Sequence, residues 1–195
     1  MLRRILIIQG HPDATERHFG HALAADYAEA AQDAGHEVHP IEIAALDFPL
    51  LRSARDWEHG GPPASLVEAQ QRIRWADHVV FFFPLWLGDM PALLKAFLEQ
   101  VARPGFAFRP TPTGGLGEKL LAGRSARVVV TMGMPGLVYR FYFRAHSVRA
   151  LERNLLGHLG FSPVDETLIG QVAALDDAAR IRWLATMRRL GRLGC

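Results

Sequence analysis

The chain has 195 residues, which suits one domain with a sizeable core, and we expect a single domain over residues 1–195. Hydrophobic residues make up 49% of the chain and charged residues 22%, and no apolar run approaches the ~18 residues that span a bilayer, so the composition excludes a membrane-embedded protein. The net charge is +2 and the arginines are mostly dispersed, so we interpret the arginine-rich C-terminal segment as a solvated helix face and predict no nucleic-acid partner.

The N-terminal residues 1–9 are too short for a signal peptide and lead into Gly-His-Pro rather than a cleavage site, so we expect a cytoplasmic protein. Cys195 is the single cysteine, which excludes an internal disulfide and a cysteine-based zinc site, and we predict no metal ion. A mildly positive potential favours phosphorylated cofactors such as NADPH.

The first strand is predicted over residues 4–9, and a helical apolar stripe runs from Phe19 to a stop at Gly35. The loop between them lies at a helix N-terminus, where free N–H groups and the helix dipole attract anions. His11, Arg17 and His18 add side-chain donors to this loop. We therefore favour a phosphate site here; the alternative is an ordinary turn with surface histidines.

Residues 37–43 alternate polar and apolar side chains, which predicts a half-buried or edge strand. Residues 44–63 are punctuated by proline and glycine and predict a long connection. A helix is predicted from about residue 63 to residue 75.

The central stretch combines a strand, a loop and a helix. Residues 79–83 are a run of β-branched and aromatic residues, typical of a strand buried on both faces, and Pro84 ends it. A helix follows Pro91, with Asp89 as its predicted cap. The loop over residues 84–90 is unusually apolar, which favours either a wall for a flat ligand or burial under another segment or subunit.

The second half of the chain repeats the pattern. Residues 103–117 predict a loop or small hairpin, residues 126–131 a buried strand, and residues 132–136 a glycine-rich turn. Ser147 is predicted to cap the next helix, which Gly160 ends. A last strand is predicted over residues 163–169, and Asp176 is predicted to cap a terminal helix.

Strands and helices alternate about five times, which predicts a doubly wound, five-stranded parallel α/β sheet. In a flavodoxin-like order (2-1-3-4-5), strands one, three and four are neighbours, so the three loops that follow them converge on one crevice. One loop supplies phosphate donors and two supply flat or backbone surfaces, a combination that suits flavin mononucleotide (FMN).

Several motifs in this order resemble the flavodoxin-like NAD(P)H:quinone oxidoreductases, a family that includes the modulator-of-drug-activity proteins and the ancillary flavoproteins of potassium efflux systems. The resemblance rests on Ala76-Asp77-x-Val79-Val80-Phe81-x-Phe83-Pro84-Leu85, on Pro91-Ala92-x-Leu94-Lys95, on His11 with Phe19, and on Thr131-x-Gly133.

The resemblance implies two groups of site residues. The phosphate-binding positions of the family match His11, His18, Phe19 and Gly20. The loop along the flavin ring matches Pro84, Leu85, Trp86 and Leu87, and the turn on the other side of the ring matches Thr131, Gly133 and Gly136. The predicted cofactor site is completed by three more residues of the same loops, Arg17, Gly88 and Met132. Tyr139 and His146 are candidates for steadying negative charge on the reduced ring, with plain packing or helix capping as the alternative.

The implied activity is two-electron, ping-pong hydride transfer from NAD(P)H to a quinone or similar acceptor, with FMN preferred to FAD, in a homodimer. A second reading is a flavin-binding regulatory subunit that docks peripherally on a membrane cation-efflux transporter. A flavodoxin-type electron carrier fits less well because those proteins are usually acidic. The Gly-x-Ser-x-Gly elbow of the common α/β hydrolases is absent from the sequence.

Overall fold

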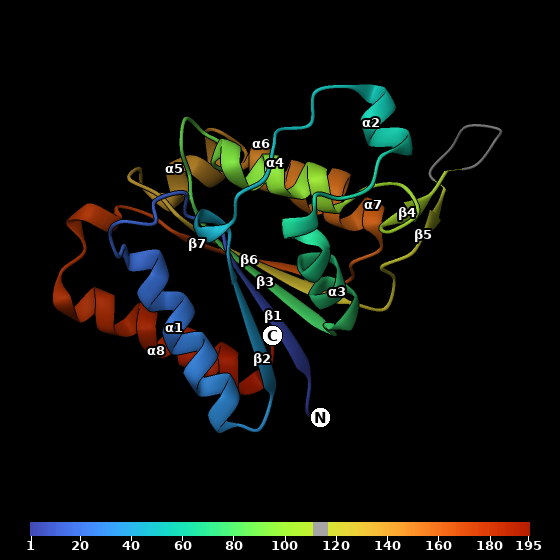
Figure 1. Cartoon of the computed structure of the whole chain (residues 1–195). Coiled ribbons are helices and arrows are strands. Elements are labelled where there is room, and N and C mark those ends of the chain that lie inside the picture. Colours follow the sequence, from blue (N-terminus) through green and yellow to red (C-terminus); the bar gives the residue numbers. More distant parts are fainter. Residues whose placement is uncertain (111–116) are drawn as a thin grey trace.

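In the computed structural model, which describes residues 1–110 and 117–195, a five-stranded parallel sheet lies between two layers of helices (Figure 1). The strand order is β2-β1-β3-β6-β7, which confirms the predicted flavodoxin-like order. The strands are β1 (Arg4–Gln9), β2 (Glu37–Glu42), β3 (His78–Pro84), β6 (Ser125–Thr131) and β7 (Val164–Ile169).

Helices cover both faces of the sheet. Two long helices, α1 (Phe19–Asp33) and α8 (Asp177–Leu193), pack together on one face (Figure 1). The remaining helices are α2 (Ala54–His59), α3 (Val67–Trp75), α4 (Ala92–Val101), α5 (Gly136–Phe141), α6 (His146–Ala150) and α7 (Gly157–Leu159), with a π-helical segment over Leu151–Leu156 and short 3₁₀ turns over Ile43–Ala45, Ala64–Leu66 and Val172–Ala174.

The central strand β3 shows why the sheet needs two layers. Val79 and Phe81 pack into the core under α3 and α4, whereas Val80 and Phe82 pack into the core under α1 and α8. All four are at most 3% exposed. Because successive side chains of a strand point to opposite faces, a run of apolar residues must be covered on both.

Most helix ends follow the predicted signals. Asp176 caps α8 by accepting a hydrogen bond from the Ala179 N–H (2.7 Å), as predicted. Gly35 and Gly160 adopt positive φ where α1 and α7 end, a conformation that glycine tolerates without strain.

Two predicted caps are wrong. Asp89 does not cap α4 but accepts a hydrogen bond from the Met90 N–H, because Trp86 and Asp89 close a two-residue hairpin turn with Leu87 and Gly88 at positive φ. Ser147 does not cap a helix either. α6 begins at His146, and Ser147 Oγ is hydrogen-bonded to Tyr139 Oη instead (2.6 Å).

The predicted connection over residues 44–63 contains α2, which the sequence analysis did not identify. Ser53 caps it, and the buried Arg103 guanidinium donates to the Asp56 carbonyl and carboxylate, which ties the excursion to the end of α4. The predicted small hairpin is an antiparallel pair of β4 (Phe108–Arg109) and β5 (Glu118–Lys119), with residues 111–116 outside the described residues.

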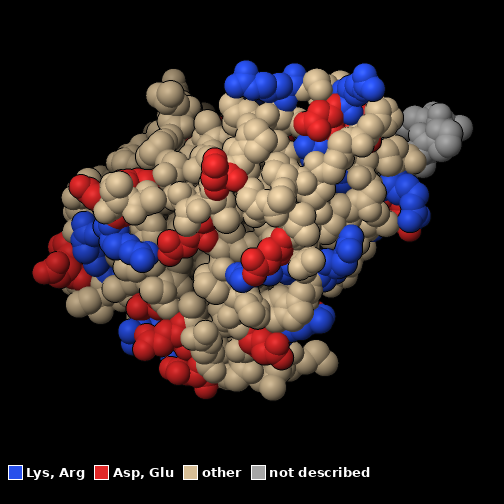
Figure 2. Space-filling model, viewed as in Figure 1, with Lys and Arg blue, Asp and Glu red and all other residues tan. Residues whose placement is uncertain are grey.

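On the face shown in Figure 2, Lys and Arg side chains are interspersed with Asp and Glu. In the described part of the chain, no helix is both long and apolar enough to cross a membrane.

Candidate active site

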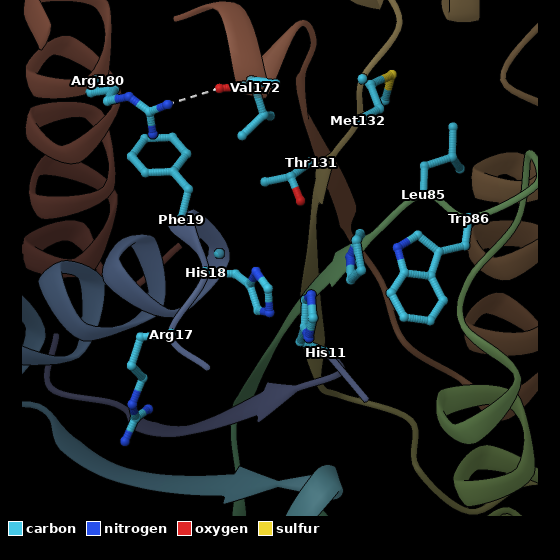
Figure 3. A pocket seen from close by; sticks show the side chains of 14 residues that line it. His11, Arg17, His18, Phe19, Leu85, Trp86, Thr131, Met132, Val172 and Arg180 are labelled. Atoms are coloured by element: carbon cyan, nitrogen blue, oxygen red, sulfur yellow. Dashed lines mark hydrogen bonds between the residues drawn. The ribbon is translucent and has the colours of Figure 1, made fainter. Parts of the chain in front are cut away.

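A cavity of about 490 Å³ opens at the carboxyl ends of β1, β3 and β6, the crevice where doubly wound sheets bind ligands. The predicted phosphate loop, the apolar loop after β3 and the turn after β6 all reach it (Figure 3). Its lining residues are His11, Arg17, His18, Phe19, Gly20, Pro84, Leu85, Trp86, Thr131, Met132, Gly133, Val172, Ala173 and Arg180.

The loop after β1 is held close to the sheet. The Gly10 N–H donates to the Phe82 carbonyl (2.6 Å), and a Cβ at Gly10 would lie 2.8 Å from Leu94 Cδ2, so a larger residue here would force the Leu94 side chain to move. Gln9 joins the loop to the helix, because its side chain accepts from the His11 N–H and donates to the Gly20 carbonyl. The N-terminus of α1 is thereby aimed at the cavity, where its first N–H groups lack partners within the helix.

Histidines gather at this N-terminus. The rings of His11 and His18 are stacked with centroids 3.9 Å apart (Figure 3). The His21 ring centroid lies 5.4 Å from that of His11. Burial, followed by the neighbouring His18 and His21, lowers the pKa of His11 from 6.5 to about 4. Burial and then Arg17 also lower the pKa of His21.

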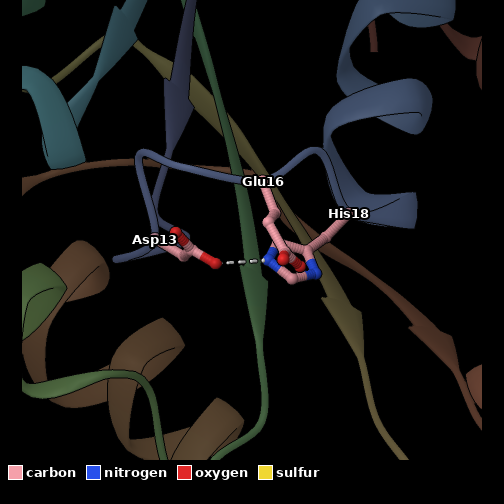
Figure 4. A group of neighbouring side chains, drawn as sticks. All are labelled: Asp13, Glu16 and His18. Carbon is pink, nitrogen blue, oxygen red and sulfur yellow. Dashed lines mark hydrogen bonds and ion pairs between the residues drawn. The ribbon is translucent and has the colours of Figure 1, made fainter.

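Asp13 holds His18 in place. Its carboxylate lies 2.9 Å from His18 Nε2 (Figure 4) and accepts hydrogen bonds from the N–H and hydroxyl of Thr15. Bonds to Thr15 and then to His18 hold the pKa of the Asp13 carboxyl well below its ordinary range. Asp13, Glu16 and His18 bring one potential metal-ligand atom each within 4.8 Å of one another, but exposed acidic groups commonly gather without an ion, and we assign no metal to them.

The opposite wall of the cavity is flat and apolar. Trp86 remains 49% exposed, and its ring lies edge-on to His11 with centroids 5.7 Å apart. The Leu85 N–H donates to the Thr131 carbonyl (2.7 Å), which fixes the loop after β3 against the turn after β6. An aromatic side chain beside the apolar Leu85 suits a planar ring system.

Sequence reasoning missed three lining residues, all near the C-terminus. Val172 and Ala173 belong to the turn after β7, and Arg180 reaches the cavity from α8. The Arg180 guanidinium lies 5.2 Å from the centre of the Phe19 ring and donates to the carbonyls of Val172 and Leu175. The interpretation of the C-terminal arginines as a solvated face is therefore wrong for Arg180. In the sequence, Arg180 could have been identified as a lining residue by its position soon after the carboxyl end of the last strand.

Three predicted cofactor residues lie outside the lining. Leu87 and Gly88 form the tip of the hairpin turn, with Leu87 fully exposed. Gly136 lines a separate cavity of about 380 Å³, together with Leu137 and Phe141.

The two predicted catalytic side chains also lie outside the lining. Tyr139 is 2% exposed, and its hydroxyl is bonded to Ser147. His146 is exposed at the start of α6. Their catalytic role stays a prediction.

The donor set fits a phosphorylated flat cofactor. A helix N-terminus, imidazoles and Arg17 stand on one side of the cavity, and Trp86 and Leu85 on the other. The presence of these two chemistries in one crevice suits a phosphate joined to a planar ring, and the volume is in the range of small-molecule sites.

Residues 3–189 match the model of a protein family described as having a flavodoxin-like fold. An uncharacterized NAD(P)H oxidoreductase of Haemophilus influenzae is 28% identical over 179 residues, covering 90% of this chain and 87% of the relative. The FMN-dependent NADH:quinone oxidoreductase 3 of Bacillus anthracis is 27% identical over 150 residues, covering 68% of this chain and 70% of the relative.

Among solved structures, the NAD(P)H:quinone oxidoreductase from Methanothermobacter marburgensis superposes with a TM-score of 0.80. It is 24% identical, and the match covers 98% of both chains, which shows a shared fold. The named relatives are oxidoreductases, so the comparisons do not favour the alternative of a transporter's regulatory subunit.

Proposed function

The chain belongs to the flavodoxin-like fold family, and from that premise we propose that it is an FMN-dependent NAD(P)H oxidoreductase that reduces quinone-type acceptors. The names of its relatives support both the cofactor and the reaction. We further propose that it acts as a single domain in the cytoplasm without a nucleic-acid partner.

One observation carries the proposal: an anion-binding helix N-terminus and a flat apolar wall face each other across one cavity at the sheet's topological switch point. His18, Phe19 and Gly20 would hold the phosphate at the start of α1. Trp86, Leu85 and the backbone near Gly133 would hold the ring.

Bound FMN would supply the redox chemistry, a two-electron transfer from NAD(P)H to the acceptor. The chain's own residues would bind and orient the cofactor and exclude water from its ring. The apolar side chains of Leu85 and Trp86 limit water at the ring wall, and the open side of the cavity leaves room for donor and acceptor to use one slot in turn.

We also propose that the protein forms a homodimer through apolar side chains beside the cavity. Leu137, Phe141 and Tyr142 on and just after α5 are 72 to 79% exposed, and Leu87 at the tip of the loop after β3 is fully exposed. Several large, exposed apolar side chains on one helix usually mark an interaction surface.

Light scattering at micromolar concentration tests this dimer. The wild-type chain should have twice the monomer mass, and Phe141→Ser should shift it towards the monomer. Ile181→Ser is the matched control, because Ile181 is 65% exposed on α8. A monomeric wild-type chain would refute the dimer without touching the proposed activity.

The decisive test of the proposed function is spectroscopic. The purified full chain is incubated with FMN, freed of excess cofactor and examined in the visible range. We expect a retained flavin band that bleaches on anaerobic addition of NADPH or NADH and returns when a quinone is added. A protein that retains neither FMN nor FAD would overturn the proposal.

A further inference from the structure

Three imidazoles meet at the start of α1: His11 from the loop, His18 at the N-cap and His21 in the first turn. The His18 and His21 rings are 5.9 Å apart, and each lies within that distance of His11. Two of the three, His11 and His18, line the cavity where the proposed phosphate site lies (Figure 3).

Backbone hydrogen bonds decide which nitrogen of each ring can take a proton. The Asp13 N–H donates to His11 Nδ1 (3.1 Å), and the His18 N–H donates to His21 Nδ1 (3.0 Å). Both rings therefore carry their proton on Nε2, and a second proton on Nδ1 would break the backbone bond. His11 and His21 are thus held as neutral N–H donors.

The hydrogen bonds of the His18 ring differ from those of the other two rings. Its Nε2 faces the Asp13 carboxylate at 2.9 Å, so that nitrogen is the donor, and its side chain also accepts from the His21 N–H in a capping box at the start of α1. A proton on Nδ1 would still leave the His21 N–H bonded to the His18 carbonyl (2.9 Å), and the resulting positive charge would lie beside a carboxylate. The Asp13 carboxylate is itself fixed by the Thr15 N–H and hydroxyl.

The charged groups around the cluster are mixed. Asp13 and Glu16 from the loop place carboxylate oxygens near His18 (Figure 4). Arg17 is paired with Glu42 of β2 at 3.2 Å, and Arg180 of α8 lines the far side of the cavity. Because Arg17 is partly neutralised by Glu42, an entering dianion needs a further positive charge.

We propose that a phosphate monoester entering this cavity draws one proton onto His18 Nδ1, so that cofactor loading is coupled to proton uptake, with Asp13 as the positioning residue. The proton comes from solvent and no covalent bond is formed. This inference rests on the proposed function for its natural ligand, the phosphate of FMN, but the same chemistry would serve the 2′-phosphate of NADPH or free phosphate.

The test is an NMR titration of the full chain with ¹⁵N-labelled histidines, alone and with FMN, riboflavin or inorganic phosphate. The His18 signals are identified by their loss in His18→Asn, which keeps a good N-cap residue. We expect FMN to raise the pH midpoint of His18 by about 1–3 units, the usual effect of an adjacent opposite charge. Phosphate should act likewise at higher concentration, and riboflavin, which lacks the phosphate, should not.

Two further variants sharpen the test. Asp13→Asn removes the carboxylate charge but retains an oxygen for Thr15, and should lower the His18 midpoint in the FMN complex, because the imidazolium loses one of its two negative neighbours. His18→Asn should weaken FMN binding about tenfold, the order of one charge-assisted hydrogen bond, without changing riboflavin binding. His59→Asn, an exposed histidine on α2, is the control and should change neither.

The outcomes separate the two claims. Bound FMN that leaves the His18 midpoint unmoved, or that moves His11 or His21 instead, overturns the inference and leaves the proposed function standing. If FMN does not bind, as judged by unquenched flavin fluorescence, the proposed function fails. The phosphate arm alone then decides the inference, since an unmoved His18 midpoint overturns it.

Discussion

At the amino end of the sheet, His36 and His78 join separate elements of the fold, whereas at the carboxyl end His11 and His18 bond to Asp13 of their own loop and line an open cavity. His78 Nδ1 lies 2.7 Å from Ser125 Oγ, and His36 joins the Arg3 N–H to the Arg192 carbonyl. These contacts tie β1, β3, β6 and the end of α8 together. The amino-end histidines therefore serve the fold.

The carboxyl end of the sheet retains groups that can bind a ligand. The first N–H groups of α1 have no partner within the helix, and Trp86 remains half exposed. The same residue type thus has different uses at the two ends. Burial does not distinguish them, since His11 and His36 are each 7% exposed; the difference is that His11 and His18 line the cavity. Substitutions at the amino end, which we call the closed end, should change the free energy of unfolding. Substitutions at the carboxyl end, which we call the open end, should change ligand binding.

Phe82→Ala should give the largest effect on stability. Phe82 is 1% exposed under α1 and α8, and truncating such a side chain costs about 3–5 kcal/mol. Trp86→Ala, four residues along, should change the free energy of unfolding by less than about 1 kcal/mol. Urea unfolding of both variants measures the contrast. Equal losses would contradict the division between a closed core and an open rim.

His78 should make the protein less stable in acid. Burial, followed by Arg3 and Arg127, lowers the pKa of His78 from 6.5 to about 3. The unfolded chain therefore binds the extra proton first, so the stabilising contribution is complete above pH 6.5 and is lost as the pH falls from 6.5 towards 3. From pH 6.5 to pH 5 the loss is up to about 2 kcal/mol.

His78→Gln tests this directly, because glutamine can still bond to Ser125 but does not titrate. The difference in unfolding free energy between pH 7 and pH 5 should be smaller in the variant than in the wild type. An unchanged pH dependence would show that His78 is not the responsible group.

Tyr139→Phe decides whether the predicted catalytic role of Tyr139 holds. If its hydroxyl stabilises charge on the reduced cofactor, the rate of quinone reduction should fall at least about tenfold at unchanged FMN affinity. The control is Ser147→Ala, which removes only the hydroxyl partner of Tyr139. A rate for Tyr139→Phe within twofold of wild type would assign the residue to packing between α5 and α6.

Arg180→Ala should weaken FMN binding several-fold, because Arg180 both lines the cavity and holds the turn after β7 through the Val172 carbonyl. Arg182→Ala on the same helix is the matched control, since Arg182 is exposed and outside the cavity lining. Fluorescence quenching of FMN measures both. Similar FMN affinities for the two variants would support the interpretation of Arg180 as part of a solvated helix face.

The sheet and its order could be predicted because apolar runs such as residues 79–83 alternate with helical stripes, and parallel strands bring their carboxyl ends together. The loops that follow β1, β3 and β6 were identified for the same reason. Their local chemistry, such as the imidazoles near Phe19 and the apolar loop around Trp86, is visible in the sequence itself.

The remaining features depend on tertiary geometry. Arg180 reaches the cavity only because α8 crosses α1 with that face inward, and no local pattern separates it from Arg182. The Asp89 cap was wrong because Asp89 ends a tight turn through Leu87 and Gly88, and its carboxylate accepts from the adjacent Met90 N–H instead of an N–H of α4. Short side chains near a helix start have several such partners, and packing selects among them.

Tyr27→Phe should have the smallest effect and the most informative sign. Tyr27 is fully buried between α1 and the sheet, and its hydroxyl has no hydrogen-bond partner among the described residues. Burial raises the pKa of this phenol, which shows that its surroundings disfavour charge. Removing a buried, unpartnered hydroxyl should leave the free energy of unfolding unchanged or raise it by up to about 1 kcal/mol. A loss of more than about 1 kcal/mol in urea unfolding would mean that an ordered water satisfies the hydroxyl, and that the closed end of the sheet contains water.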